Sequence, residues 1–285
     1  MAMLRFILVL SLVLCCFKLV AEPNKQQLRI VALAPHIVEN LYTIGAGEQI
    51  VGTVEYADFP AAANNIVRIG GYQGIQLEKL LALKPDLVLA WKTGNKTEDL
   101  ARIKDFGIEV SYSDASEVDK VPNELRRLGV LTGREKAAAQ AASKFEEKIA
   151  AIRAQQQGKK SVAVFYQLWP EPMMTVGKNT WINQLIDICQ GRNVFANSRT
   201  DYPQISIENV VVAKPEVIIL PDEKSQKQQA VIDWSSWPEV PAVKNNQFIH
   251  VNADLLHRFT TRMLDGLADM CTKIDDSRVA IKEAQ

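Results

Sequence analysis

One stretch of 19 residues occurs twice in this chain, and this repeat constrains the fold more than any other feature. The sequence YQGIQLEKLLALKPDLVLA begins at Tyr72, and YPQISIENVVVAKPEVIIL begins at Tyr202. The offset is 130 throughout, so Glu78 corresponds to Glu208. Each copy predicts a short helix, a Lys-Pro pair that ends it and then an apolar strand, because proline keeps the preceding residue out of the helical region. The repeat therefore predicts two lobes of similar build.

Short apolar runs alternate with helical patterns on both sides of the repeat. The expected strands are 28–35, 49–56, 87–91, 109–112, 161–168, 216–221 and 247–252. The expected helices are 37–45, 77–83, 98–106, 181–189, 207–212 and a terminal helix from about Thr260. Apolar strands that alternate with helices indicate parallel sheets covered on both faces. We therefore predict an α/β fold of two Rossmann-like lobes with mostly parallel sheets and a ligand cleft between the lobes.

A helix-forming segment separates the two halves. Thr132 precedes Glu135 at capping-box spacing, the following residues are mostly Ala, Glu, Lys and Gln, and Gly158 ends the run. A helix of about 25 residues would be a rod of roughly 37 Å. The expected organisation is an N-terminal lobe at 22–131, a bridging helix at 132–158 and a C-terminal lobe at 159–285. Because one stiff helix would join the lobes, we expect only small closure motions.

The first 21 residues have the pattern of a cleavable secretory signal. Arg5 supplies a positive charge, residues 6–17 are apolar, and Ala21 is a small residue at a cleavage position. The apolar run is about half of the roughly 20 residues that a membrane helix needs. Lipid attachment through Cys15 or Cys16 stays open, although a leucine before the first of them is a poor match to such sites.

Charge and cysteine content narrow the function classes. Removing residues 1–21 takes away Arg5 and Lys18 and no acidic residue, which leaves 31 basic and 33 acidic side chains and a net charge of −2. This balance gives no electrostatic case for nucleic acid or an anionic membrane as partner. The remaining cysteines, Cys189 and Cys271, most simply form one disulfide in an exported protein, and two buried free thiols are the alternative.

Aromatic residues occur where the expected strands end and loops begin. Ligands of open α/β sheets bind at the carboxyl ends of the strands. Several rings in one cleft would suit a large, flat and partly apolar ligand, whereas any single ring could equally be a core or rim residue. The five aromatic candidates are Tyr56, Tyr72, Trp91, Trp169 and Tyr202.

The two repeated glutamates have two competing interpretations. Each of Glu78 and Glu208 falls in the first turn of its expected helix, where a carboxylate stabilises the helix by roughly 0.3–1 kcal/mol. Their symmetric placement on two lobes also predicts two acidic docking points for a two-fold symmetric partner.

Metal and enzyme signals are weak. The three histidines, His36, His250 and His257, are scattered, and only His36 follows a strand end where it could face a cleft. The chain has no G-x-S-x-G and no G-x-x-x-x-G-K-[ST], and GAGEQIVG at 45–52 is better explained as a helix end and a turn. We therefore expect neither an enzyme nor a metal site.

The chain resembles the periplasmic substrate-binding proteins of the helical-backbone class, which serve ABC importers for siderophores, haem, cobalamin and some metals. The resemblance covers essentially all of the chain after residue 21. It rests on RIVALAPHIVENLYTIGAGEQIVGTVEYADFP, on LEKLLALKPDLVLAW and on the long middle helix. Within the class, the segments EYADFP, LVLAWKTGN, SRTDYPQIS and NADLLHRFTTR are most similar to members that bind cobalamin.

The resemblance implies a role for each matching residue. Tyr56, Tyr72, Trp91 and Tyr202 would contact the corinoid ring and its nucleotide loop, Asp254 and Arg258 would add polar contacts, and no protein group need ligate the cobalt. Trp169, which follows the expected strand 161–168, is also an expected ligand residue. Tyr72 and Tyr202 stand where the family pattern has tryptophan, and DLLHRF is less aromatic than the corresponding DWFER-like segment.

The resemblance also implies partners and location. Glu78 and Glu208 would engage arginines of a dimeric ABC importer permease with its ATPase subunits, and Cys189–Cys271 matches the family's single disulfide. The expected protein is periplasmic, monomeric when free and without a catalytic cofactor, and cobalamin is its transported ligand. The alternative within the class is a haem or ferric-siderophore binding protein.

Overall fold

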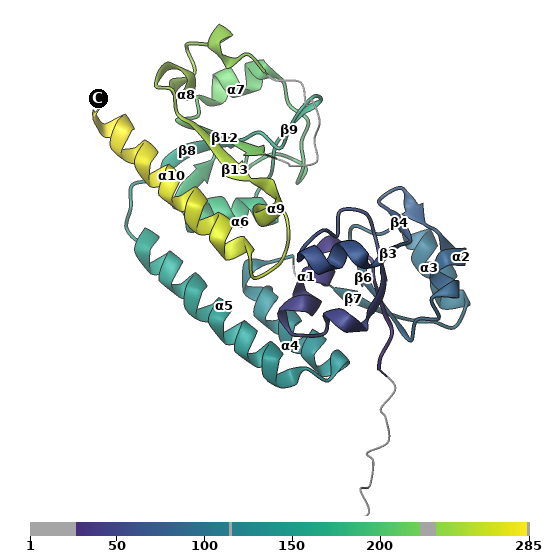
Figure 1. Cartoon of the computed structure of the whole chain (residues 1–285). Helices are drawn as coiled ribbons and strands as arrows, with labels where there is room; N and C mark the ends of the chain where they lie inside the picture. The colour runs from purple at the N-terminus through teal and green to yellow at the C-terminus, as the bar shows by residue number, and fades with distance from the viewer. Residues whose placement is uncertain (1–26, 114–115, 223–231, 284–285) are drawn as a thin grey trace, which may run out of the picture.

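The computed structural model describes residues 27–113, 116–222 and 232–283. The expected signal and the two cysteines that precede its end lie outside these residues. Two α/β lobes stand side by side, and a long helix, α5, runs along both of them (Figure 1). None of the helices in the described ranges is both long enough and apolar enough to span a membrane.

The N-terminal lobe is built on a five-stranded parallel sheet in the order β3-β2-β1-β6-β7. The central strands are short and apolar and are buried up to the half-buried Trp91 at the end of β6, as expected for a sheet with helices on both faces. Its strands are β1 Ile30–Ala32, β2 Ile50–Thr53, β3 Val67–Arg68, β6 Leu87–Trp91 and β7 Glu109–Ser113. Its helices are α1 Pro35–Thr43, α2 Leu77–Ala82 and α3 Thr97–Asp105.

The C-terminal lobe repeats this design with a four-stranded parallel sheet in the order β11-β8-β12-β13. Its strands are β8 Val162–Tyr166, β11 Gly191–Asn193, β12 Val217–Asp222 and β13 Phe248–Asn252. Its helices are α6 Trp181–Ile188, α7 Ile207–Ala213, α8 Pro241–Lys244, α9 Ala253–Leu256 and α10 Met263–Glu283. The Cys189–Cys271 disulfide joins the end of α6 to α10. The predicted two-lobe α/β class with parallel sheets is confirmed.

The repeated turn has the same structure in both lobes. Lys84 and Lys214, each before a proline, adopt left-handed backbone with φ of 46° and 48°. Proline excludes the right-handed helical region as expected, but the residue before it is left-handed rather than extended. The next acidic residues, Asp86 and Glu216, accept the backbone N–H of Arg29 at 2.8 Å and of Ala163 at 2.7 Å, respectively. Each carboxylate therefore joins the turn to the neighbouring strand of its own sheet.

The middle of the chain forms two helices, of which the second corresponds to the helix predicted over 132–158. The first, α4 Val121–Thr132, ends at Gly133, whose φ is +66°. The second, α5 Glu135–Gln156, begins after Arg134, so the predicted capping box at Thr132 is wrong. Instead, the Thr132 hydroxyl donates back to the Leu128 carbonyl at 2.7 Å. Gly133 adopts the left-handed conformation at little steric cost, so it ends α4 at this point and Thr132 is the last residue of a helix rather than the start of one.

Candidate ligand-binding site

Two hairpins, one in each lobe, present aromatic side chains to solvent. In the N-terminal lobe β4 Gly70–Gly71 pairs with β5 Gly74–Ile75, and Tyr72 lies in the turn with 75% of its surface exposed. Gly70 and Gly74 have φ of 136° and 146°, backbone angles that residues other than glycine rarely adopt. The hairpin is held to α3, because the backbone N–H of Ile75 donates to Asp99 Oδ2 at 3.0 Å.

The hairpin of the C-terminal lobe is formed by a different part of the chain, β9 Trp169–Pro170 with β10 Met173–Met174. An isolated bridge joins Met174 to Gln204, so this hairpin lies beside the segment that carries Tyr202. Trp169 and Tyr202 are 47% and 53% exposed. Burial of its remaining surface, and then the charge of Asp201, raise the pKa of Tyr202. The Tyr202 hydroxyl therefore stays protonated at neutral pH and can donate a hydrogen bond.

Tyr56 occupies a constrained position in the loop after β2. Its φ is +63°, and its side chain is 59% exposed. A left-handed backbone is an outlier for a bulky residue and persists only where the surroundings hold it. Arg258 Nη2 donates to the Tyr56 carbonyl at 3.2 Å, and Arg68 Nη2 donates to the Ala57 carbonyl at 2.8 Å. Two arginines thus hold the loop that presents this tyrosine.

Arg258 is the centre of an ion-pair network between the lobes. Its guanidinium contacts Glu39 at 2.7 Å, Asp58 at 2.9 Å and Asp254 at 3.1 Å. Burial opposes the charge of Arg258, but the hydrogen bonds that it donates to Glu39 and Asp58 outweigh this effect and raise the pKa of Arg258. Arg262 adds a second cation at 3.2 Å from Glu39. The structure therefore brings Tyr56, Asp254 and Arg258 together, and Arg258 links the two lobes. A direct contact of Asp254 or Arg258 with the ligand stays a prediction.

A cluster of aromatic rings lies next to this network. His36 and Trp91 of the N-terminal lobe meet Phe259, which follows Arg258, at ring-centroid distances of 5.2 and 5.9 Å, and each other at 5.4 Å. Trp181 of α6 packs edge-on against Phe259 at 4.6 Å. Burial, and then the charge of Arg258, lower the pKa of His36 to about 3, so its ring is neutral.

Sequence reasoning placed Trp91 correctly at the end of β6, and it missed Glu39, Trp181 and Phe259. The sequence shows that Phe259 follows Arg258. The contact between Phe259 and Trp91 depends on how the two lobes pack. Tyr72, Trp169 and Tyr202 lie on other segments, and within the described part of the chain none of these three rings stacks on the cluster. Their joint contact with one ligand stays a prediction.

The two repeated glutamates occupy matching places on the surface. Glu78 and Glu208 both lie in the first turn of their helices, and both are exposed. From Ile75 to Leu80 and from Ile205 to Val210, the two copies have the same order of half-buried, exposed and buried positions. A hydrogen bond from Ser206 lowers the pKa of Glu208, which keeps this carboxylate charged at neutral pH.

The other two histidines lie apart from His36. His250 is on β13 and pairs with Asp222 at 3.0 Å. His257 lies just after α9 and shares a hydrogen bond of 2.9 Å with the Tyr166 hydroxyl. No group of three or more His, Cys, Asp or Glu in the described residues is arranged to hold a metal ion.

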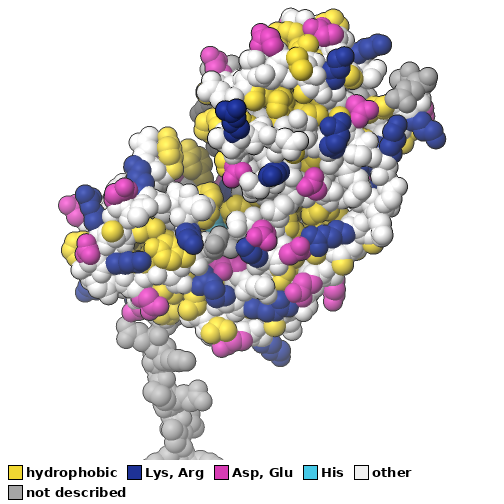
Figure 2. Space-filling model, turned by 180° about the vertical axis from the view of Figure 1, so that it is seen from behind, with side chains coloured by type: hydrophobic (Ala, Val, Ile, Leu, Met, Phe, Trp, Pro, Cys, Tyr) yellow, Lys and Arg dark blue, Asp and Glu magenta, His cyan; other side chains and the backbone are white. Residues whose placement is uncertain are grey.

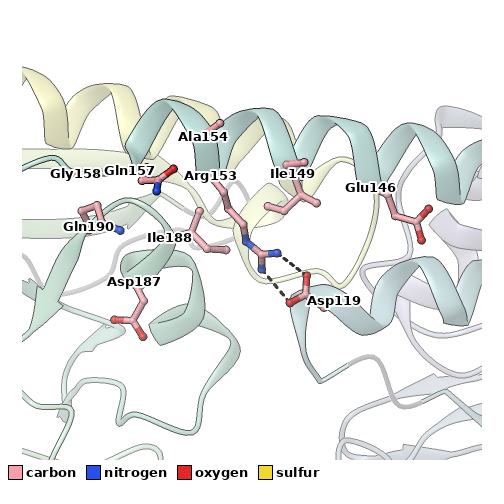
Figure 3. Close-up of a pocket in the computed structure, with 11 residues that line it drawn as sticks. Asp119, Glu146, Ile149, Arg153, Ala154, Gln157, Gly158, Asp187, Ile188 and Gln190 are labelled. Atoms are coloured by element: carbon pink, nitrogen blue, oxygen red, sulfur yellow. Dashed lines mark hydrogen bonds and ion pairs between the residues drawn. The ribbon is translucent and has the colours of Figure 1, made fainter.

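The space-filling view shows a notch between the two lobes, with hydrophobic side chains where the lobes meet (Figure 2). A separate hollow of about 830 Å³ runs along α5 and is lined from α5, the end of α6 and the short turn η3 Val118–Lys120. Figure 3 shows Arg153 of α5 reaching across this hollow to Asp119, with bonds of 2.9 and 3.0 Å. None of the predicted ligand residues lines it, so this second hollow is distinct from the notch.

Comparisons with known proteins agree with this architecture. A family model described as periplasmic binding protein matches residues 30–255. The vitamin B12-binding protein of Vibrio parahaemolyticus serotype O3:K6 is 34% identical over 259 residues, which cover 90% of this chain and 92% of the relative. The vitamin B12-binding protein of Pectobacterium carotovorum subsp. carotovorum is 32% identical over 272 residues, which cover 95% of each.

Among solved structures, the periplasmic vitamin B12 binding protein BtuF of Vibrio cholerae matches with a TM-score of 0.81 and 33% identity, over 88% of this chain and 97% of that one. The periplasmic heme binding protein HutB of Vibrio cholerae matches with a TM-score of 0.74 at 19% identity, over 87% of this chain and 98% of that one, which shows a shared fold alone. The family match spans most of both lobes and includes the segments that carry the exposed aromatic residues. This chain therefore belongs to the periplasmic binding protein family.

Proposed function

We propose that this protein captures cobalamin between its lobes and delivers it to an ABC importer. The observation that carries the proposal is that relatives named vitamin B12-binding protein are similar over nearly the whole chain, at 34% identity over 90% of it. The vitamin B12 binding protein of Vibrio cholerae has the same fold with a TM-score of 0.81.

The surface chemistry supports a large, flat ligand. Tyr56, Tyr72, Trp169 and Tyr202 each leave between 47% and 75% of their surface exposed, two on each lobe. A fully buried aromatic residue removes roughly 150–250 Å² from water, and each of these four still has about half or more of its surface available for a ligand to cover. We assign these four rings, Trp91, Asp254 and Arg258 to the cobalamin site.

Capture in this site needs no catalysis and little motion. The lobes are joined by α5, by the ion pairs of Arg258 and by Gln184 of α6, whose Oε1 accepts the backbone N–H of Val118 at 3.0 Å. Links at several points resist a hinge motion that one flexible strand would allow. Cobalamin would therefore enter a cleft whose walls are already in place.

Delivery would use the outer surface of both lobes. We propose that Glu78 and Glu208 dock on basic residues of a two-fold permease, one glutamate for each half, because they occupy equivalent exposed helix starts. Cobalamin release would then follow ATP hydrolysis by the importer's ATPase subunits. The family is periplasmic, and we propose that residues 1–21 direct export and are removed.

Isothermal titration of residues 22–285 with cyanocobalamin tests the binding role. We expect one-to-one binding, a weaker affinity for Trp91→Ala, and an unchanged affinity for Phe106→Ala, which removes an exposed ring at the end of α3. Absence of heat at micromolar concentrations would contradict the proposal. A spectral change and tight binding with hemin in place of cyanocobalamin would instead favour the haem alternative.

A further inference from the structure

The loop between α9 and α10 belongs to the C-terminal lobe but lies against the N-terminal lobe. Figure 1 shows this loop reaching from α9 to the vicinity of α1. At its start, Trp181 Nε1 donates to the Leu256 carbonyl at 2.8 Å, which holds the loop to α6. Further along, Asn40 Nδ2 of α1 donates to the Phe259 carbonyl at 3.0 Å. The loop is therefore bonded to one lobe at its start and to the other lobe at Phe259.

The ring of Phe259 is enclosed by rings from both lobes. Trp181 lies edge-on at 4.6 Å on the C-terminal side. His36 and Trp91 lie on the N-terminal side at 5.2 and 5.9 Å, with interplanar angles of 74° and 68°. Edge-to-face pairs at such distances stabilise one relative orientation of the rings. Phe259 therefore couples the orientation of Trp91 to the position of the C-terminal lobe.

Residues of the N-terminal lobe restrict the orientation of the Trp91 indole on several sides. Its backbone N–H donates to Asn95 Oδ1 at 2.7 Å. A methyl group placed on Gly94 would come within 1.9 Å of Trp91 Cε3, so the loop backbone lies directly on the indole. His36 covers another side at 5.4 Å and 86°. Phe259 then contacts the indole from the C-terminal lobe.

We infer that Phe259 is a positioning residue for ligand binding, because it fixes the indole of Trp91 in the cleft before the ligand arrives. The inference rests on the proposed function for the identity of the ligand. A ring that is already oriented loses less conformational entropy on binding, and this gain appears mainly as slower dissociation. Phe259 would raise affinity through Trp91 even where it does not touch cobalamin itself.

A double-mutant cycle on cyanocobalamin binding tests this inference. We expect Phe259→Ala to raise the Kd about tenfold in the wild-type background, and by less than about threefold in a Trp91→Ala background. Equal factors in the two backgrounds would overturn the positioning role. Phe259→Tyr keeps the ring, so its Kd should stay within about threefold of wild type. A rise in Kd as large as that of Phe259→Ala would contradict the role.

Near-ultraviolet circular dichroism of the ligand-free protein gives a readout that does not depend on cobalamin. Phe259→Ala should change the tryptophan bands, and the change should be clearly smaller in a Trp91→Phe background, where only the contact between Phe259 and Trp181 is left to lose. Identical changes in both backgrounds would assign the signal to Trp181 and overturn the inference. A wild-type protein that binds no cyanocobalamin would reject the proposed function, whereas the dichroism would still decide whether Phe259 orients Trp91.

Discussion

Glu39 of α1 and Arg258 of the loop after α9 lie 219 positions apart and form an ion pair of 2.7 Å in which the side chains are only 2% and 11% exposed. Each belongs to a different lobe, so the pair joins the lobes at the same place as the aromatic cluster around Phe259. A carboxylate as buried as Glu39 needs its cations, because an unpaired buried charge is costly.

Replacing Arg258 with alanine should destabilise the protein by about 3–5 kcal/mol, since it leaves Glu39 buried with only Arg262 nearby. Urea denaturation monitored by far-ultraviolet circular dichroism measures this loss. The matched control is Arg126→Ala, because Arg126 makes a two-bond pair of 2.8 and 2.9 Å with Glu146 on the exposed surface. We expect the control to cost about 1 kcal/mol or less. Equal losses for both variants would show that the Arg258 network does not stabilise the contact between lobes.

Lowering the pH from 7 to 5 should destabilise the protein because of two buried histidines. Burial lowers the pKa of His36 to about 3 and of His257 to about 4, against about 6.5 in the unfolded chain. Because the unfolded chain takes up protons that the folded state refuses, stability is full above pH 6.5 and falls as the pH decreases toward the folded values. Between pH 7 and pH 5 each histidine should cost about 2 kcal/mol.

Urea denaturation at pH 7 and pH 5 measures this dependence. His36→Phe keeps a ring in the cluster and should remove about half of the loss. The same slope in His36→Phe as in wild type would refute this explanation.

Gly70 should be required for the presentation of Tyr72. A Cβ atom at Gly70 would lie 2.2 Å from the Gly74 carbonyl oxygen, and the φ of 136° is unfavourable for alanine. Gly70→Ala should therefore distort the hairpin and weaken cyanocobalamin binding by about tenfold, if Tyr72 contacts the ligand. Titration calorimetry measures the change.

The control for Gly70 is Gly107→Ala. Gly107 also has a positive φ, +77°, but nothing lies within 4 Å of the added atom. We expect this variant to lose about 1 kcal/mol of stability and to keep its affinity. Unchanged affinity in Gly70→Ala would remove Tyr72 from the site.

The paired glutamates should matter for transport and not for binding. A Glu78→Ala/Glu208→Ala double variant should bind cyanocobalamin like wild type, because both carboxylates are exposed at helix starts, and it should fail to support uptake. Uptake of labelled cyanocobalamin by cells that lack the endogenous binding protein measures this. The control pair is Glu98→Ala/Glu135→Ala, two exposed glutamates in the first turns of α3 and α5. Normal uptake by the first pair would reject the docking role.

The local parts of this structure could be predicted because local patterns determine them. The strand Leu87–Trp91 was predicted to the residue, and the helices that begin at Leu77 and Ile207 start where the repeat places them. The prolines at 85 and 215 ended those helices for a steric reason that acts between adjacent residues. The same kind of local reasoning failed at Thr132, where a helix start and a helix stop competed and Gly133 decided for the stop.

The sequence by itself determined two α/β lobes, a helical connection between them, a duplicated unit with its two exposed glutamates and the strand-end position of Trp91. Only the tertiary structure decided which side chains of one lobe meet those of the other. Arg258 meets Glu39, and Phe259 meets Trp91 and His36, across separations of about 170 to 220 positions. Such contacts follow from how two separately formed sheets pack against one loop, and no periodicity within either lobe encodes that packing.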